Sequence, residues 1–234
     1  MLTFNLNKLS LPNESKILDV GCGEGRHIFG SLQKFQNVYC IGLDQDLLLL
    51  DACKEGLNFF NELNSRSTTF MQGSVYSLPF DDNSFDLIFC SEVLEHLEDY
   101  HAAIKEIYRV LKSGGKFLSS VPSFWPEKIC WTLSKDYQEM PGGHLRIFKK
   151  QQIIKDITNH GFKYEQSERF HGFHSAYWWC RCIFWKNQDS NPIVRVYKKF
   201  LEYQILKNPF WLQLLEKCIN PIFGKSIAFY FQKQ

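Results

Sequence analysis

The sequence lacks any long uninterrupted hydrophobic run. No stretch of the 234 residues approaches the roughly 18 consecutive apolar residues that a membrane-spanning helix needs. The first residues, MLTFNLNKLSLPNESK, have no basic cluster followed by an apolar core, so they do not look like a signal or transit peptide. We therefore expect a cytoplasmic, globular protein, for which 44% apolar and 22% charged residues is an ordinary composition.

Closely spaced cysteine pairs are also scarce. The eight cysteines are scattered, no C-x-x-C pair occurs, and only Cys180 and Cys182 are near neighbours. One such pair cannot complete a zinc shell, and several cysteines lie in apolar runs such as DLIFC. The sequence therefore predicts reduced cysteines, no disulfide framework and no metal site.

The chain as a whole has little net charge, but its two parts differ. The net charge is +2, with 12 Lys and Arg against 19 Asp and Glu in residues 1–145 and 15 against 6 in residues 146–234. The basic second part suits an anionic partner or a membrane surface, although solvated lysines explain it equally well. Since the basic residues form no stripe and no RNA-binding module is recognisable, nucleic acid is not the expected partner.

Strand and helix patterns alternate along most of the chain. Strands are predicted at 16–20, 37–43, 68–73, 85–90, 116–122 and 162–170. Helical spacing occupies 24–36, 46–63, 100–115 (with a glycine C-cap at its end) and 149–161. This alternation predicts an α/β fold with a doubly wound, mostly parallel sheet.

The last third of the chain breaks this pattern. Residues 171–224 read as aromatic-rich amphipathic helices, and 225–233 alternate apolar and polar residues like an edge strand. We expect seven strands in all, with a helical insertion before the last one. Accordingly we assign 1–170 to a core domain, 171–224 to the insertion and 225–234 to the edge strand that completes the core.

The segment ILDVGCGEGRH, residues 17–27, carries the clearest functional signal. A buried-looking strand runs into Gly21, Gly23 and Gly25 at alternate positions. A dinucleotide loop of the form G-x-G-x-x-G would need its third glycine where Arg26 stands. The spacing is therefore wrong for NAD.

Acidic residues around this loop point to a positively charged ligand. Glu24 lies in the turn, where its carboxylate would repel a pyrophosphate at the helix start, and Asp19 adds negative potential. S-adenosylmethionine (SAM) has a sulfonium and an ammonium, no phosphate, and ribose hydroxyls that a carboxylate can hold. Asp44, 19 residues after Gly25 at the end of the second strand, is placed for that ribose contact.

Four segments together resemble the class I SAM-dependent methyltransferases of the type 11 kind: ILDVGCGEG, IGLD, GSVYSLPFDDNSFDLIFCSEVLEHLED and RVLKSGGKFLSSVP. The resemblance covers roughly residues 15–122 and implies a Rossmann-like methyltransferase fold with SAM as cofactor. It implies that the methionine part is held by the loop after the first strand, through Asp19 and the backbone of Gly21, Cys22, Gly23 and Gly25. It further implies a ribose contact from Asp44, an adenosine contact from Gln45 and backbone contacts from Ser91.

The adenine end of the expected site departs from this family. Related sequences commonly have an acidic residue after the glycine of the QG segment, where this chain has Ser74. A serine hydroxyl can accept a hydrogen bond but carries no charge. Adenine recognition is therefore expected to rest more on the backbone around Ser74 and Val75.

Candidate catalytic residues follow from the chemistry of methyl transfer. The reaction is an in-line displacement, so positioning and exclusion of water matter most, and a base is needed only for a protonated acceptor. His96, after the fourth strand, and His144, in GGHLRIF, are candidates for that base. Arg146 is a candidate to hold an acceptor carboxylate or phosphate. The alternatives are that His96 orders its loop and that Arg146 forms a structural pair.

The start of the insertion supplies candidate substrate contacts, namely His171, His174, Tyr177 and Trp178. Such aromatic residues equally well form a core, but their place suits a lid over an apolar acceptor chamber. The sequence thus favours methyl transfer to a small or lipid-like acceptor, most readily at oxygen. The alternatives are a catalytically silent SAM-binding scaffold and an RNA methyltransferase. The sequence leaves peripheral membrane contact and the oligomeric state open.

Overall fold

The computed structural model describes residues 2–60 and 67–234. Its seven-stranded sheet has the order β3-β2-β1-β4-β5-β7-β6. The strands are β1 (Lys16–Val20), β2 (Tyr39–Asp44), β3 (Thr68–Gln72), β4 (Phe85–Ser91), β5 (Leu111–Pro122), β6 (Phe162–Phe170) and β7 (Ser226–Lys233). β7 runs antiparallel to both its neighbours, and the other adjacent strands are parallel. The expected doubly wound, mostly parallel sheet is confirmed.

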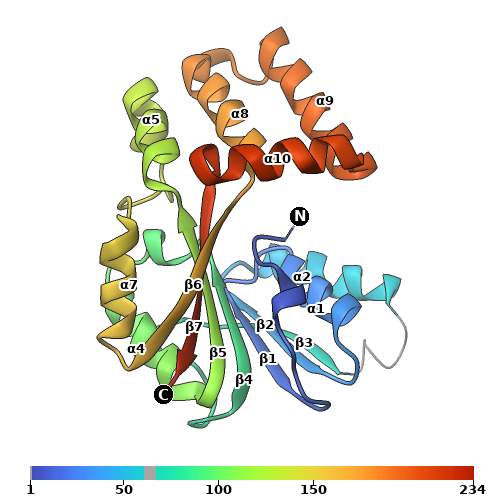
Figure 1. Cartoon of the computed structure of the whole chain (residues 1–234), viewed down its shortest axis with the longest axis vertical. Coiled ribbons are helices and arrows are strands. Elements are labelled where there is room, and N and C mark those ends of the chain that lie inside the picture. Colours follow the sequence, from blue (N-terminus) through green and yellow to red (C-terminus); the bar gives the residue numbers. More distant parts are fainter. Residues whose placement is uncertain (1, 61–66) are drawn as a thin grey trace.

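Helices cover both faces of the sheet (Figure 1). α1 (Arg26–Lys34) and α2 (Leu47–Gly56) cover one face, and α4 (Tyr100–Val110) and α7 (Lys150–Thr158) cover the other, while α5 (Phe124–Leu133) and α6 (Lys135–Gln138) follow the end of β5. Leu18 of β1 packs in one buried cluster with α4 and α7, whereas Ile17 packs in the other with α1 and α2. Because successive side chains of a strand point to opposite faces, strands covered on both sides must be apolar throughout.

Two helix ends differ from the sequence prediction. The helix expected over 46–63 ends as α2 at Gly56 and continues as a 3₁₀ turn, Leu57–Phe59, while 61–63 lie outside the described residues. α4 ends at Val110, so the glycine pair is not its C-cap. Gly114, with φ of 78°, instead lies within β5, where pairing with β4 shifts register.

The prediction that residues 225–234 form an edge strand is wrong. β7 lies between β5 and β6, which makes β6 the edge strand. Phe229 and Phe231 belong to one core cluster, and Ala228 and Tyr230 belong to the other. Both rows of side chains are therefore buried, as an interior position in a covered sheet requires.

The insertion before β7 is helical, as expected. It contains α8 (Gly172–Ile183), α9 (Pro192–Lys207) and α10 (Phe210–Phe223). Together with α5, which α8 contacts, these helices form a lobe beyond the carboxyl ends of the parallel strands (Figure 1). We call α5, α8, α9 and α10 the helical lobe. Within the described part of the chain, no helix has both the length and the apolar character to cross a membrane. The separate role assigned to the insertion stays a prediction.

Candidate active site

The glycine loop joins β1 to α1 in a backbone conformation that favours glycine. Gly21, Gly23 and Gly25 have φ values of 70°, 53° and 74°. Side chains are disfavoured in this left-handed region. A Cβ atom at Gly21 would also lie 2.4 Å from Cγ2 of Val93, so the loop passes close to the segment after β4.

Asp44 fixes the loop from the end of β2. Its Oδ2 accepts a hydrogen bond from the Gly23 amide at 2.8 Å, and its Oδ1 accepts one from the Asp46 amide at 3.0 Å. Each carboxylate oxygen keeps further acceptor capacity. Asp44 can therefore hold the loop and ribose hydroxyls at the same time.

Asp19 lies buried beneath the loop with no hydrogen-bond partner for either carboxylate oxygen in the described structure. Burial raises the pKa of Asp19 to about 7, which the Arg26 charge opposes and the Asp44 charge reinforces. A buried carboxylate normally has a partner. This orphaned acid therefore fits a ligand that brings positive charge, as SAM does.

A cavity of about 480 Å³ opens beside the loop, and we call it the cofactor cavity. Its lining includes Gly21, Asp44, Gln45 and Val75 from the expected cofactor set, together with His96 and Glu92. The cavity sits at the carboxyl ends of the strands, where open α/β sheets bind ligands.

The remaining expected cofactor residues lie around this cavity rather than on its lining. Cys22 is buried in the glycine loop. The hydroxyl of Ser74 accepts a hydrogen bond from the Tyr76 amide at 3.3 Å. Tyr76 itself lines the cavity, although the sequence analysis did not name it. Ser91 is buried, and its hydroxyl lies 2.9 Å from both Arg26 Nη2 and the Ser120 hydroxyl. These contacts use the side chain of Ser91 and leave open the backbone role expected of it.

A second cavity, of about 540 Å³, lies between the sheet and the helical lobe, and we call it the acceptor cavity. Glu92 and His96 line both cavities. Its lining also includes His144, His171, His174 and Trp178 from the expected set. Tyr177 is not on this lining, because its ring packs against Tyr197 and Trp178 within the lobe. The structure thus brings most of the predicted chemistry to one pair of adjoining cavities.

Glu127 of α5 is the centre of a buried polar network beside the acceptor cavity. Its Oε1 accepts hydrogen bonds from His144 Nδ1 and the Tyr137 hydroxyl, both at 2.8 Å, and its Oε2 pairs with Lys225 Nζ. Burial raises the pKa of Glu127, but the His144 hydrogen bond and the charges of Lys225 and His144 outweigh it and lower the pKa to about 2. Glu127 is therefore ionised, and the Nδ1–H of His144 donates to it; in the neutral form of His144, Nε2 is then the acceptor.

His96 lies against this network. Its ring centroid is 4.9 Å from that of His144, and its Nδ1 is 3.2 Å from the Gly143 carbonyl oxygen. Burial, with the neighbouring His144, lowers the pKa of His96 below its usual value. The two predicted catalytic histidines therefore meet in one place, and His96 is neutral at physiological pH.

Arg146 is used differently from the expectation. Its guanidinium donates to the carbonyl oxygens of Leu94, Leu97 and Glu98, and it stacks over the Tyr100 ring at 5.1 Å. Arg146 thus orders the segment that carries His96 and is absent from the lining of the acceptor cavity. The structure favours the alternative of a structural role, with carbonyl oxygens rather than acids as partners.

Sequence reasoning missed Glu92, Glu127 and Lys225. Glu92 follows β4 with φ of 56° and accepts a hydrogen bond from the Ser120 hydroxyl at 2.9 Å. Non-glycine residues with positive φ gather at functional sites. Glu127 did leave a signal, as the only acid in the apolar run of α5. The sequence around Lys225, just before β7, gives no such signal.

Two groups of described side chains could share a metal ion: Glu95 with His96 and His144, and His171 with His174 and Glu216. In each group the ligand atoms lie within 4.8 Å of one another. Burial raises the pKa of Glu95 well above its usual range, so its carboxyl stays neutral, and His144 already donates Nδ1 to Glu127. Burial lowers the pKa of His171 to about 3 and that of His174 to about 4. The expected absence of a metal site stays a prediction.

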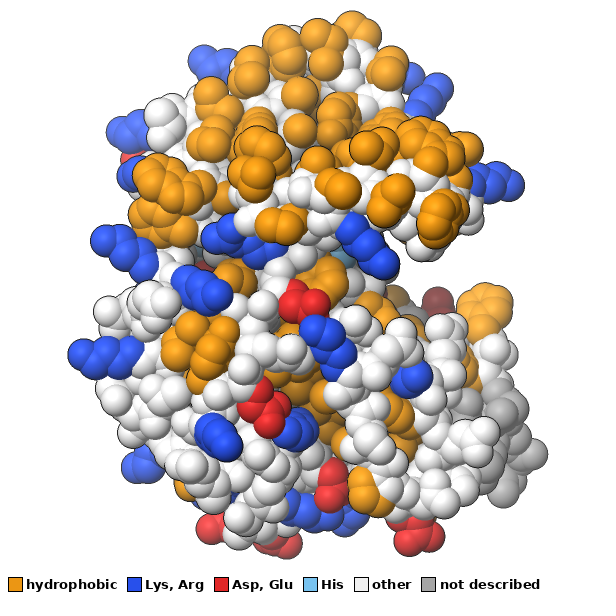
Figure 2. Space-filling view, viewed as in Figure 1, with side chains coloured by type: hydrophobic (Ala, Val, Ile, Leu, Met, Phe, Trp, Pro, Cys, Tyr) orange, Lys and Arg blue, Asp and Glu red, His pale blue; other side chains and the backbone are white. Residues whose placement is uncertain are grey.

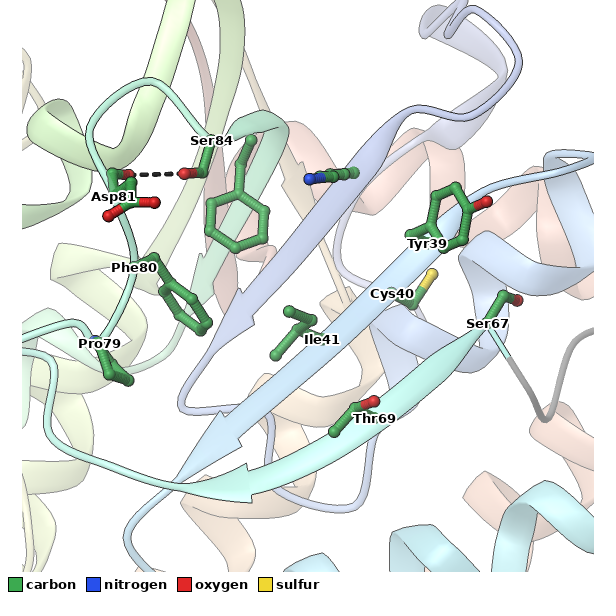
Figure 3. A pocket seen from close by; sticks show the side chains of 11 residues that line it. Tyr39, Cys40, Ile41, Ser67, Thr69, Pro79, Phe80, Asp81 and Ser84 are labelled. Atoms are coloured by element: carbon green, nitrogen blue, oxygen red, sulfur yellow. Dashed lines mark hydrogen bonds between the residues drawn. The ribbon is translucent and has the colours of Figure 1, made fainter.

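A further cavity, of about 430 Å³, lies near the opposite end of the sheet (Figure 3). Tyr39, which begins β2, and Thr69 of β3 line it together with Phe80. It lies at the amino ends of the parallel strands, whereas ligands of such sheets bind at the carboxyl ends. It is therefore not the candidate active site.

Comparisons with known proteins find methyltransferases. Residues 18–119 match the family described as a methyltransferase domain. An uncharacterized methyltransferase, C1B3.06c, of Schizosaccharomyces pombe is 40% identical over 103 residues, which are 43% of this chain and 37% of that protein. Sterol 24-C-methyltransferase erg6 of Aspergillus fumigatus is 33% identical over 116 residues, which are 47% of this chain and 29% of that protein.

Solved structures show the same fold. The structure of a putative methyltransferase from Bacillus halodurans superposes with a TM-score of 0.64 at 20% identity, covering 97% of this chain and 96% of that one. The chain spans less than two thirds of the curated relatives just named, so their similarity concerns the shared domain. The matched residues contain the glycine loop, Asp44 and His96, so the comparisons identify residues 18–119 as a SAM-dependent methyltransferase domain.

Proposed function

We propose that this chain transfers a methyl group from SAM to an amphipathic, lipid-like acceptor at an oxygen atom. One observation carries the proposal: the acceptor cavity adjoins the cofactor cavity at Glu92 and His96 and contains the His144 side chain held by ionised Glu127. An imidazole oriented by a buried carboxylate is suited to remove a proton from a hydroxyl.

The cofactor cavity supplies the contacts for SAM in this proposal. Asp44 holds the ribose, and Gln45 and the backbone around Val75 hold the adenosine. Asp19 favours the positive charge of the ligand, and the nearby Arg26 guanidinium suits the carboxylate of the methionine part. When bound, SAM supplies a methyl group on a positively charged sulfur.

The histidines act on the acceptor. His144 Nε2 would accept the proton of the acceptor hydroxyl, and SAM, held by Asp44 and Gln45, would supply the methyl group that replaces this proton on the oxygen. Glu127 stabilises the imidazolium that results, and neutral His96 positions the acceptor. The helical lobe, which lines the acceptor cavity through His174 and Trp178, would limit the access of water to the methyl group.

The walls of the acceptor cavity support a largely apolar acceptor. Met140, Trp178 and Ile205 contribute apolar surface beside the histidines. Pockets of this kind bind molecules with an apolar body and few polar groups. The relative from Aspergillus fumigatus is by name a sterol methyltransferase, and the name places its methyl group on carbon. The likeness supports a lipid-like acceptor, while the oxygen target rests on the His144–Glu127 pair.

The His144→Gln variant tests this assignment. We expect turnover to fall by roughly 10²- to 10⁴-fold, as for the loss of a general base. SAM affinity should stay unchanged, because His144 does not line the cofactor cavity. Turnover is measured as radiolabelled methyl entering the lipid, polar and RNA fractions of a cell extract, with SAM affinity from calorimetry. His101→Gln, at an exposed position on α4, is the matched control.

The destination of the label decides between the alternatives. Label in lipid, on a carbon whose ¹³C shift is that of a methoxy group, supports the proposal. Label in RNA favours an RNA methyltransferase. SAM binding without label in any fraction favours a silent SAM-binding protein, and either result contradicts the proposal.

A further inference from the structure

The outward face of α10 is apolar along its whole length. Its exposed residues at helical spacing are Phe210, Trp211, Leu214, Leu215, Cys218 and Ile222. The opposite face packs on the protein through Leu212, which is 1% exposed, whereas Phe210 is 79% exposed. Helices of globular proteins normally turn their apolar stripe to the core. α10 has apolar side chains on both faces, and only one of them is covered.

The exposed apolar surface extends beyond α10 across the helical lobe. Leu206 and Val196 of α9 are 80% and 68% exposed, and Trp125 of α5 is 68% exposed. Figure 2 shows hydrophobic side chains gathered over the lobe, with Lys and Arg at its edges. Monomeric soluble proteins rarely expose a large continuous apolar surface, and those that do use it for binding.

The charges that border this surface are mainly positive. α9 exposes Arg195, Lys198, Lys199 and Lys207 and has Glu202 as its only acid. On α10, Lys217 is exposed, while Glu216 is half-buried and accepts a hydrogen bond from Gln204. Long basic side chains can lay their aliphatic stems on an apolar surface and extend their charges to anionic groups.

We propose that the outer face of the helical lobe, formed by α9, α10 and the exposed side of α5, binds the surface of a membrane that contains anionic lipids. Phe210 and Trp211 would enter the boundary between headgroups and acyl chains, and the basic residues of α9 would contact lipid phosphates. This mode needs no spanning helix. It also needs no methyl transfer, so its failure would leave the proposed function standing.

Charge argues against a second copy of this chain as the occupant. In a two-fold symmetric dimer the same face of both copies meets. The cations Arg195, Lys198 and Lys199 would then lie against a face with the same excess of positive charge, with Glu202 as the only acid of α9 to offset them. An anionic lipid surface complements the same charges.

Vesicle sedimentation tests the proposal with the full chain. Two vesicle types are compared, phosphatidylcholine alone and an equal mixture of phosphatidylcholine with phosphatidylglycerol. We expect the native chain to sediment with the mixed vesicles and to bind the neutral ones more weakly. The Leu206→Ser/Phe210→Ser variant should bind the mixed vesicles at least ~10-fold more weakly, because two side chains that enter the boundary are lost.

Matched variants separate docking from general hydrophobicity. Leu48→Ser/Phe59→Ser removes two side chains that are 81% and 90% exposed but lie outside the lobe, and it should bind like the native chain. Lys198→Glu/Lys199→Glu should lose the preference for phosphatidylglycerol. Circular dichroism confirms that each variant is folded.

Three results would overturn the proposal. The first is that the native chain fails to bind the mixed vesicles. The second is that Leu206→Ser/Phe210→Ser binds the mixed vesicles as well as Leu48→Ser/Phe59→Ser does. The third is a dimer in analytical ultracentrifugation that Leu206→Ser/Phe210→Ser dissociates, without any vesicle binding, which would identify the face as an interface between copies.

Discussion

Asp19→Asn is expected to stabilise the fold while removing most of the affinity for SAM. The pKa of Asp19 is raised from 3.8 to about 7, first by burial. A raised carboxyl pKa means that the folded state disfavours the charge, so Asp19 destabilises the fold increasingly as pH rises from the unfolded value through the folded one. A difference of about 3 pKa units corresponds to about 4 kcal/mol, an upper limit for the gain in the uncharged variant.

The same charge should make SAM binding depend on pH. Below its pKa the carboxyl is neutral, and above it the carboxylate attracts the ligand's cationic groups. Affinity of the native chain should therefore rise between about pH 6 and about pH 8, whereas that of Asp19→Asn should stay low and flat. Calorimetry measures affinity, and urea unfolding at the upper pH measures stability.

A matched control is available on α2. Asp51 is exposed and forms an ion pair with Lys54. Asp51→Asn should therefore change neither SAM affinity nor the free energy of unfolding appreciably. Unchanged SAM affinity in Asp19→Asn would show that the buried charge is not used to attract the cofactor.

Glu127→Gln is expected to have the opposite effect on stability. The pKa of Glu127 is lowered from 4.5 to about 2, so its contribution to stability is present above the unfolded value and is lost as pH falls through the folded one. Near neutral pH the variant leaves the buried Lys225 ammonium without its carboxylate. Breaking a buried pair in this way typically costs about 3–5 kcal/mol. Turnover should also fall, because the orientation of His144 is lost.

A second substitution separates these two effects. Glu127→Gln/Lys225→Met removes both charges, so most of the stability lost in urea unfolding should return. Turnover should stay low, because the ionised partner of His144 is still missing, and SAM affinity should match the native chain. Recovery of turnover together with stability would show that Glu127 has only a structural role.

Local sequence determined the cofactor half of the site. Gly21, Gly23 and Gly25, which the sequence placed in a loop after the first strand, adopt positive φ values, and Asp44 ends β2 where an acid can reach the loop. These features lie within single strand–turn–helix units. Because parallel strands run in the same direction, their carboxyl ends lie together at one edge of the sheet. Ser91 and Cys22 lie around the same loop for this reason.

Only the tertiary structure decided the acceptor half. Glu127 pairs with Lys225, which is 98 positions later in the chain, and Arg146 donates to carbonyl oxygens about fifty residues earlier. β7 is inserted between β5 and β6 although it comes last in sequence. Alternation of residue types predicts which elements form and which residues share a face. It does not give the order of antiparallel strands, the partner of a buried charge, or which apolar side of α10 is covered. These features depend on contacts between elements that are distant in sequence, and alternative sets of such contacts compete in free energy.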